Sequence, residues 1–325
     1  MDISSDVAAA ALRMLGHCGN LKAGESLFVL ADPETSRLGG ILTESGRECG
    51  APSALIIDPP SAIHGMEPSS SAAAAMQQAD LIACVTIMSK AHTQARLHAS
   101  RNGARFLSLP DYSLDMLTSK AMSTDFRSHL STCSDLAARL SRARHVEVAS
   151  RSGTRIRMEV TGRTANACPG CVLNPGDLGS PPDIEVNIAP LESSAEGIIV
   201  VDGSITCPEI GLLKSPLVLQ VLEGRVVDAR GDSAVEAAWH QVFLRAADDK
   251  AWIIGELGIG LNPNAQLTGI MLTDEGALGT VHFGLGSNAT IGGLNQVPFH
   301  LDCVIRDATV LVDGRVLIDC GRLHV

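Results

Sequence analysis

The hydrophobic pattern of the sequence changes near residue 144, and this change constrains the fold more than any other feature. Up to residue 143, short apolar runs alternate with amphipathic segments of helical length. Such alternation is typical of parallel strands that are connected by helices. Beyond residue 144, strand-like runs follow one another. We therefore predict two domains: an α/β domain with a parallel sheet at 1–143, and a β-rich α+β domain at 144–325.

The predicted N-terminal sheet consists of short strands that are separated by helices. The strand-like runs are aliphatic or β-branched and end at turn residues; they cover residues 26–31, 53–58, 81–87 and 105–109. Helical spacing is present at 33–49, 70–80, 89–103 and 124–143. No glycine-rich phosphate loop follows the first strand, so we expect no nucleotide cofactor in this half.

The C-terminal half is a series of strands that one helix, predicted at 232–247, interrupts. Near the end of the chain, Asp313 and Gly314 separate two apolar runs. This dipeptide is preferred in two-residue hairpin loops, so we predict a β-hairpin there.

Charge and composition exclude several classes of partner. The formal net charge is −11, with 36 acidic residues against 25 lysines and arginines. Nucleic-acid binding relies on basic side chains that neutralise phosphates, so we expect none. The N-terminal segment carries acid where a secretory signal would carry base, and no apolar run approaches the roughly 20 residues that span a bilayer. We expect a cytoplasmic protein that does not act on membranes.

Cysteine usage gives one motif with two readings. The chain has nine cysteines, which are scattered along the sequence. Because their number is odd and they are not closely spaced, they do not suggest a disulfide framework. Cys168 and Cys171 form CPGC, whose spacing occurs in zinc and redox sites. No second pair completes a zinc ribbon, and turn-forming residues surround this one. We interpret it as a loop with two incidental thiols, with metal or redox use as the alternative.

Ionisable residues that interrupt apolar strands of the C-terminal half are the candidates for a metal site. Any one of them could be a hydrogen-bonded core residue or an outward-facing edge residue. Together they would cost too much to bury without cations between them. His300 and Asp302 are two positions apart in a predicted strand and therefore share one face. The full set is Glu185, Glu256, His282, His300 and Asp302.

The composition of this set indicates the kind of metal. Two imidazoles and three carboxylates suit zinc, manganese, cobalt or iron better than calcium or magnesium. Five ligands exceed the three of a catalytic zinc, so we expect two cations with a bridging water. The sequence contains neither a GxSxG elbow nor an HExxH motif.

The stretches that carry these residues resemble the aminopeptidase T and aminopeptidase S family of dinuclear metallopeptidases, also called the thermophilic metalloprotease family. They are EVNIAPLESSAEGIIVVDGSI, GELGIGLNPNAQLTG, GTVHFGLGSN and HLDCVIRDATVLVDGRVL, with KAHTQARLHASRNGARFLSLPDYSLDML in the first half. The resemblance implies that the same five residues bind metal and that the chain forms a homodimer. One departure is that Asn288, Ala289 and Thr290 stand where the peptidases have a tyrosine near the metals.

The chain is also similar to the 2,5-dihydroxypyridine dioxygenase branch, which looks like a diverged relative of that family. The shared stretches are HLD and GLNPNAQLT. This resemblance implies one iron held by two histidines and one aspartate. The positions that discriminate are Glu256, where the dioxygenase has histidine, and Glu185 and His282, where it has apolar residues.

From these features we predict a metal-dependent hydrolase, aminopeptidase-like or amidase-like, that uses a metal-activated water on a small molecule or short peptide. A nearby carboxylate would carry the proton to the leaving nitrogen. The candidates for that role, which could equally be solvated loop or strand-end acids, are Glu192, Glu196 and Glu275. The alternatives are a mononuclear non-haem iron dioxygenase that opens a hydroxylated pyridine-like ring, and a metal-dependent binding protein without turnover.

Overall fold

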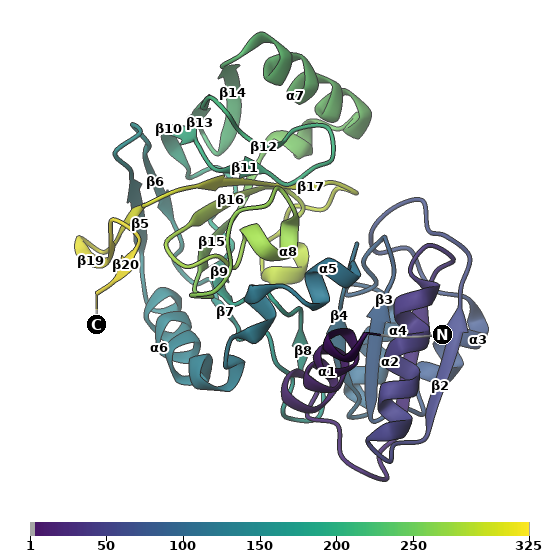
Figure 1. Cartoon of the computed structure of the whole chain (residues 1–325). Helices are drawn as coiled ribbons and strands as arrows, with labels where there is room; N and C mark the ends of the chain where they lie inside the picture. Colours follow the sequence, from purple (N-terminus) through teal and green to yellow (C-terminus); the bar gives the residue numbers. More distant parts are fainter. Residues whose placement is uncertain (1–3, 325) are drawn as a thin grey trace. The chain divides into compact units, whose positions relative to one another are not determined.

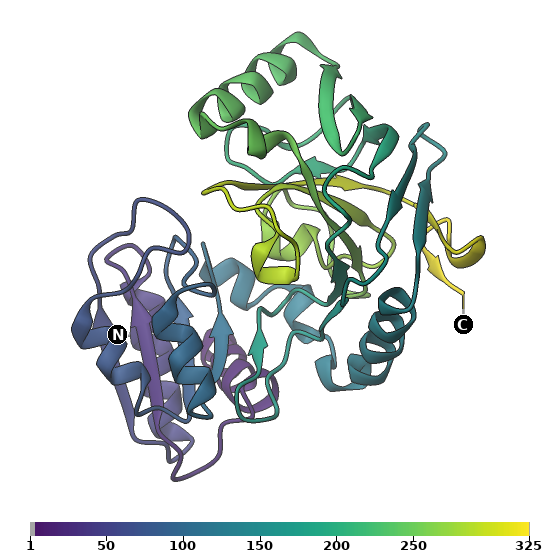
Figure 2. The ribbon, with the colours of Figure 1, turned by 180° about the vertical axis from the view of Figure 1, so that it is seen from behind.

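The computed structural model describes residues 4–324 and divides into two compact units. The first unit comprises residues 4–128 together with Cys168–Pro182, and the second comprises His129–Ala167 together with residues 183–324. Figures 1 and 2 show the elements of both units from opposite sides. No helix among the described residues has the length and apolar character needed to cross a membrane.

The first unit is built on a parallel sheet of five strands in the order β2-β1-β3-β4-β8. Every pairing in this sheet is parallel. The strands are β1 Leu27–Ala31, β2 Ser53–Ile57, β3 Leu81–Val85, β4 Arg105–Ser108 and β8 Leu178–Gly179. The predicted parallel sheet with connecting helices is therefore confirmed.

Helices and helical turns connect these strands. They are α1 Ser5–Arg13, η1 Met14–Cys18, α2 Ser36–Glu48, α3 Ser70–Met76, α4 Gln94–Arg101, α5 Leu114–Leu117, η2 Lys120–Ser123 and η3 Phe126–His129. Ser69 caps α3 and Thr93 caps α4, because each side chain accepts a hydrogen bond from a first-turn backbone N–H that has no partner within the helix.

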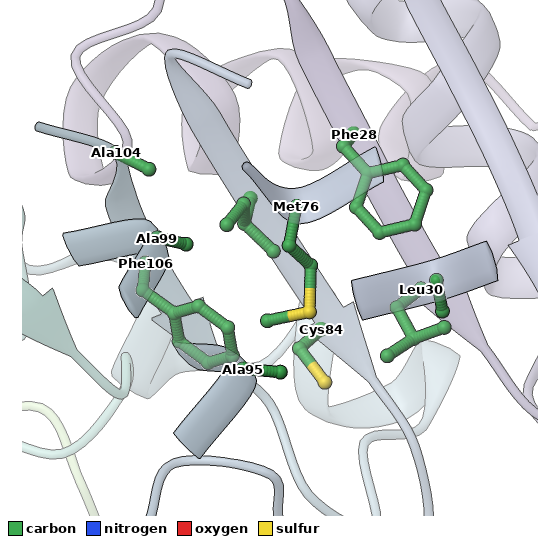
Figure 3. Close-up of a cluster of buried hydrophobic side chains, with 10 residues drawn as sticks. Phe28, Leu30, Met76, Cys84, Ala95, Ala99, Ala104 and Phe106 are labelled. Carbon is green, nitrogen blue, oxygen red and sulfur yellow. The ribbon is translucent and has the colours of Figure 1, made fainter. Parts of the chain in front are cut away.

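Figure 3 shows the core between α3, α4 and one face of the parallel sheet. Phe28 and Leu30 alternate along β1, so both side chains point to this face. Met76 of α3 and Phe106 of β4 pack in the same cluster, and Ala95 belongs to the face of α4 that packs here. The buried residues that α4 contributes to this cluster are alanines, Ala95 and Ala99.

The second unit contains two antiparallel sheets. One has eight strands in the order β14-β13-β10-β6-β5-β18-β19-β20. Its strands are β5 His145–Ala149, β6 Arg155–Glu159, β10 Glu196–Val201, β13 Leu217–Leu222, β14 Arg225–Arg230, β18 Thr309–Val312, β19 Arg315–Asp319 and β20 Arg322–Leu323. Asp313 and Gly314 both have positive φ between β18 and β19, which confirms the predicted hairpin.

The other sheet of the second unit has seven strands in the order β12-β11-β17-β16-β15-β9-β7. Its strands are β7 Asn166–Cys168, β9 Glu185–Ile188, β11 Ser204–Ile205, β12 Gly211–Leu212, β15 Ile254–Gly260, β16 Val281–Gly286 and β17 His300–Ile305. The helical elements of the unit are α6 Leu130–Ser141, α7 Ser233–Ala246, η4 Asp249–Trp252, α8 Met271–Asp274 and η5 Ala289–Ile291.

The predicted division at residue 143 differs from these units in two places. Helix α6, assigned from sequence to the first domain, packs against β9 of the seven-stranded sheet and belongs to the second unit. Segment Cys168–Pro182 belongs to the first unit because β8 pairs in parallel with β4. A two-residue strand has no detectable periodicity, so hydrophobic pattern alone could not place it.

Candidate metal centre

Four neighbouring strands of the seven-stranded sheet bring the five predicted ligands together. Glu185 begins β9, Glu256 lies on β15, His282 on β16, and His300 and Asp302 on β17. The antiparallel register places Glu256 opposite Gly284, and Gly284 opposite Asp302. Residues directly opposite each other in a sheet point to the same face. The predicted strand positions of these side chains therefore translate into one cluster.

Glycines on this face leave the room that the cluster occupies. A Cβ atom at Gly258 would lie 2.0 Å from two atoms of the His282 ring. A Cβ atom at Gly284 would lie 2.8 Å from the Glu256 Cβ and 2.8 Å from the His300 ring. Both distances are too short for any other residue without displacement. The space at the centre of the sheet is thus created by missing side chains.

The cluster contains two groups that could each hold a metal ion, and they share one residue. We call them the His300 group, Glu256, His300 and Asp302, and the His282 group, Glu185, Glu256 and His282. In the His300 group, the His300 Nε2 lies 3.1 Å from Asp302 Oδ1 and 3.3 Å from Glu256 Oε2. In the His282 group, the His282 Nε2 lies 3.2 Å from Glu185 Oε2 and 3.8 Å from Glu256 Oε1. The two oxygens of Glu256 therefore face different histidines.

Contacts outside the cluster orient the ligands of the His300 group. The His300 Nδ1 donates to the Ser287 carbonyl at 3.0 Å, which leaves Nε2 for a metal. An aromatic cluster fixes the residue before it, because the Phe299 ring lies 4.9 Å from the ring of Phe243 on α7. Phe243 in turn stacks on Trp252 at 3.9 Å. His300 is thus held both through its ring and through its backbone.

The His282 group is supported differently. Asn187 donates to Glu185 Oε1 at 2.6 Å and orients that carboxylate. Among the described residues, the buried Nδ1 of His282 has no hydrogen-bond partner. The His282 side chain is only 1% exposed, whereas that of His300 is 35% exposed. One histidine of the centre is therefore accessible, and the other is enclosed.

Without a metal, the two imidazoles and the carboxylates stabilise one another's charges. Burial by itself would raise the pKa of Glu256, but hydrogen bonds and charges from His282 and His300 lower it to about 2. Burial lowers the pKa of His282, yet the negative charge of Glu185 and the other carboxylates raises it to about 9. The protonated imidazoles thus balance the negative charge of the carboxylates, as bound metal cations would. Metal binding would release these protons.

The residues present fit a metal ion. Glu185 Oε2 is buried and accepts no hydrogen bond within the described part of the chain, although the His282 Nε2 is 3.2 Å away. A buried carboxylate oxygen without a donor is costly, and a cation between the two atoms would remove that cost. Imidazole nitrogen and carboxylate oxygen are ligands that suit iron and neighbouring transition metals.

The three carboxylates expected to move protons have different surroundings. Glu196 is exposed on β10, in the eight-stranded sheet, and is not in either ligand group. Glu192 lies between β9 and β10 and binds Arg163 and backbone N–H groups. Glu275 is half-buried and hydrogen-bonds to Asp302; burial of its carboxyl group and then the charge of Asp302 hold its pKa well above the ordinary value.

Sequence reasoning missed a further buried carboxylate, Asp183. Its Oδ1 has no hydrogen-bond partner among the residues described, and burial followed by the charge of Glu185 raises its pKa well above the ordinary value. Asp183 precedes Glu185 by two positions, the same spacing that drew attention to His300 and Asp302. That spacing was the available signal.

The CPGC pair lies outside the cluster. Cys168 ends β7, and Cys171 is buried in the turn that follows. Neither cysteine belongs to a group of possible metal ligands in residues 4–324.

Comparison with known proteins decides the family. The family model of NicX, 2,5-dihydroxypyridine 5,6-dioxygenase, matches residues 9–325. The chain belongs to this family. A curated 2,5-dihydroxypyridine 5,6-dioxygenase of Pseudomonas putida (strain KT2440) is 26% identical over 193 residues, which cover 56% of this chain and 55% of that protein. The chain thus matches about half the length of this curated relative.

Solved structures show how the fold of this NicX-family chain is shared. The structure of 2,5-dihydroxypyridine dioxygenase from Pseudomonas putida KT2440 matches with a TM-score of 0.85 and 20% identity, over 99% of both chains. Wild-type AmpT from Thermus thermophilus matches with a TM-score of 0.73 and 15% identity, over 98% of this chain and 99% of the other. At these identities the likeness shows the fold, which both predicted resemblances share.

The family corrects the predicted function. The prediction of a hydrolase, with its aminopeptidase, metalloprotease and amidase terms, is wrong, because the matching family and the curated relative are dioxygenases. The prediction treated Glu185, Glu256 and His282 as hydrolase-like at the positions that discriminate between the two resemblances. Ligand types at a few positions define what a cluster can bind, but they do not define the reaction, and the whole-chain match favours the ring-cleaving alternative.

Proposed function

We propose that this NicX-family chain is an iron-dependent dioxygenase that opens the ring of 2,5-dihydroxypyridine or a closely related hydroxylated pyridine. The observation that carries the proposal is the family match over residues 9–325. The His300 group supports it, because Glu256, His300 and Asp302 could hold one cation on a sheet face that glycines keep open. The substrate class is that of the curated relative.

Three atoms would hold the iron: His300 Nε2, Asp302 Oδ1 and Glu256 Oε2. Bound iron supplies the one-electron chemistry that allows dioxygen to react with an aromatic ring. The chain's own contribution is orientation, since the Ser287 carbonyl fixes the His300 ring and the Thr206 hydroxyl lies 3.5 Å from Asp302 Oδ2. Common iron triads have two histidines and one carboxylate. The His300 group has one histidine and two carboxylates, so Glu256 gives it more negative charge than such a triad.

Access to this group is one-sided. The His300 side chain is 35% exposed, whereas those of Asp302 and Glu256 are 2% and 8% exposed. A flat ring would therefore approach the group from the side of the His300 ring. Because the two carboxylates are nearly enclosed, their charges act over a lower local dielectric than at the surface.

We further propose that the cluster binds up to two divalent cations, with Glu256 shared between the His300 and His282 groups. The separate directions of its two oxygens support this stoichiometry. Among the expected proton carriers, Glu275 is the one that contacts a proposed ligand, and its role in moving a proton near Asp302 stays a prediction.

Oxygen uptake tests the proposed function. Protein purified without oxygen and loaded with ferrous iron should consume dioxygen when 2,5-dihydroxypyridine is added, with loss of the ring's ultraviolet absorbance. The His300→Ala variant should do neither. If the parent binds iron but consumes no oxygen with this compound or with other dihydroxypyridines, the proposed reaction is wrong.

Metal content tests the proposed site independently of turnover. Elemental analysis of the parent should give between one and two metals per chain, and His300→Ala should lose the metal of the His300 group. An unchanged metal content in His300→Ala would contradict the assignment of this ligand.

We also propose that the chain forms a homodimer, as the resemblance to the dinuclear metallopeptidases implies. Sedimentation equilibrium of the full chain should then give twice the 33.9 kDa of one chain. A mass that stays at one chain over the accessible concentrations would contradict it.

A further inference from the structure

The loop that follows β16 is connected to the metal centre through the ring of His300. We call residues 287–295 the His300 loop. Its first residue, Ser287, accepts a hydrogen bond from the His300 Nδ1 at 3.0 Å and donates its N–H to the Phe299 carbonyl at 2.8 Å. The loop therefore supplies the hydrogen bond that orients the Nδ1 side of the imidazole.

A buried ion pair holds the far side of the loop. Arg163 donates to Glu192 Oε2 at 2.6 Å and to the Gly292 carbonyl at 2.5 Å. The other oxygen of Glu192 accepts from the Leu294 N–H at 2.7 Å and from the Asn288 side chain at 3.1 Å. The two charged side chains are only 8% and 21% exposed. The pair thus contacts the loop at three of its residues.

Two buried asparagines connect this pair to the Ser287 end of the loop. Asn288 Oδ1 accepts from the Asn295 N–H at 2.8 Å, and the Asn295 side chain donates to the Gly286 carbonyl at 2.7 Å. Asn288 and Asn295 are 0% and 4% exposed. A continuous series of hydrogen bonds therefore runs from Glu192 to the residue before Ser287.

Apolar burial does not hold this part of the chain. Leu294 is 81% exposed, and Gly292 and Gly293 precede it. Gly292 has a φ of +96°, a conformation that glycine adopts without strain. A loop with two glycines and an exposed leucine depends on its polar contacts for order. Hydrogen bonds to the backbone and to Asn288 lower the pKa of Glu192 despite the opposing effect of burial, so it is ionised at neutral pH.

We propose that Arg163 and Glu192 are positioning residues that order the His300 loop and thereby orient His300 for metal binding. The proposal rests on the proposed function, in which His300 is a metal ligand. It gives Glu192 a role different from the proton transfer expected from the sequence, since both of its oxygens already accept hydrogen bonds. Groups that hydrogen-bond a metal ligand directly change metal affinity by about 10- to 100-fold when they are removed. We expect a loss in the same range here, because Arg163 and Glu192 act on His300 through the Ser287 carbonyl.

The test measures Co²⁺ binding to the full chain by calorimetry and by the visible spectrum of the bound ion. We expect Glu192→Ala and Arg163→Met each to weaken Co²⁺ binding at the His300 group by about 10- to 100-fold. Glu192→Gln keeps an oxygen for the Leu294 N–H but loses the charge, so it should restore part of the affinity. Glu147→Ala, which removes an exposed carboxylate on β5, is the matched control and should bind as the parent does.

Two further measurements separate positioning from general loss of stability. In the β18–β19 turn, the Asp313 carboxylate accepts hydrogen bonds from the backbone N–H groups of Arg144 and His145. Asp313→Asn weakens these contacts, so any fall in Tm that it causes should leave Co²⁺ affinity unchanged. Asn295→Ala interrupts the same series of hydrogen bonds as Glu192→Ala. The double variant should therefore bind Co²⁺ about as well as the weaker single variant, because coupled residues are not additive.

The outcomes distinguish this inference from the proposed function. Parent-like Co²⁺ binding by Glu192→Ala would overturn the positioning role alone. The same holds if Glu192→Ala regains the full Co²⁺ affinity when variant and parent are measured at temperatures equally far below their own Tm values. Failure of the parent to bind Co²⁺ would overturn the metal function and the positioning role with it. Hydrogen exchange of the metal-free protein should be faster across residues 287–295 in Glu192→Ala, and unchanged exchange there would also overturn the inference.

Discussion

The two ligand groups share Glu256 and lie on the same sheet, yet their histidines are held in different ways. His300 donates its Nδ1 proton to a backbone carbonyl and follows an aromatic residue that is packed against α7. His282 is almost fully buried, and its Nδ1 has no partner among the described residues. The first ring is oriented by specific contacts, and the second is oriented by enclosure.

This difference bears on which group would carry the proposed reaction. In metal-ligating histidines, the N–H of the second ring nitrogen usually donates a hydrogen bond to an acceptor. His300 meets that condition. Its group is also the one with an exposed side, where a substrate could enter. The His282 group has the ligands of a metal site but lacks both properties. We therefore propose the His300 group as the catalytic one and expect the His282 group to affect mainly metal content.

Loss of Glu256 should have the largest effect, because it removes the shared ligand. Loss of a residue that only hydrogen-bonds a ligand weakens metal binding by about 10- to 100-fold. Glu256→Ala removes a ligand itself, so we expect a larger loss of affinity at both groups. Calorimetric titration with Co²⁺ and elemental analysis would check this. Retention of parent-like affinity at either group would show that Glu256 is not shared.

The two histidines should separate activity from metal content. His300→Ala should abolish oxygen uptake and lose one metal per chain, because it removes the accessible ligand. His282→Ala should lose the other metal but keep most of the oxygen uptake. An oxygen electrode and elemental analysis on both variants measure this, and equal loss of uptake in the two would remove the distinction between the groups.

Two glycine variants should show the same contrast with a smaller change. In Gly258→Ala the new Cβ atom would lie 2.0 Å from the His282 ring, whereas in Gly284→Ala it would lie 2.8 Å from the His300 ring. Each should lower the free energy of unfolding by about 1–3 kcal/mol, as added atoms in a packed site do. Only Gly284→Ala should lose oxygen uptake when iron is supplied, and the reverse result would contradict the assignment.

The smallest effect is expected at Asn187, which orients Glu185 through one hydrogen bond of 2.6 Å. Asn187→Ala should weaken binding of the second metal by up to about 10-fold and leave oxygen uptake unchanged. Competitive titration with a metal indicator would detect the difference. Asn187→Asp would be a useful comparison, since it keeps the size of the side chain but removes the donor.

Much of the fold could be predicted from the sequence because its signals are local. The strands around Leu27, Leu81 and Arg105 are short, mostly apolar runs, and the hairpin at Asp313 depends on two adjacent residues. The pairing of β8 with β4 could not be predicted, since it joins two residues to a distant strand. Long-range pairing of such short segments depends on tertiary packing and leaves no periodic pattern.

The clustering of the five candidate ligands could be predicted for a related reason, but the contacts around the cluster could not. His300 and Asp302 are conspicuous because ionisable residues interrupt apolar strands. The Ser287 carbonyl is a backbone group that no side-chain pattern marks, and Glu192 resembles any other acid in a loop. The reaction was also missed, because the ligands of this cluster are compatible with more than one metal chemistry.

Gly258 and Gly284 show that the information for this centre is partly contained in residues with no functional atoms. A search for related centres that aligns only acids and histidines would accept chains in which a single methyl group closes the space. Requiring glycine at the positions opposite the ligands on neighbouring strands would separate sheets that can receive an ion from sheets that only have the same ligand residues. It also means that directed evolution of this protein should treat both glycines as fixed positions, even though neither would bind metal or substrate.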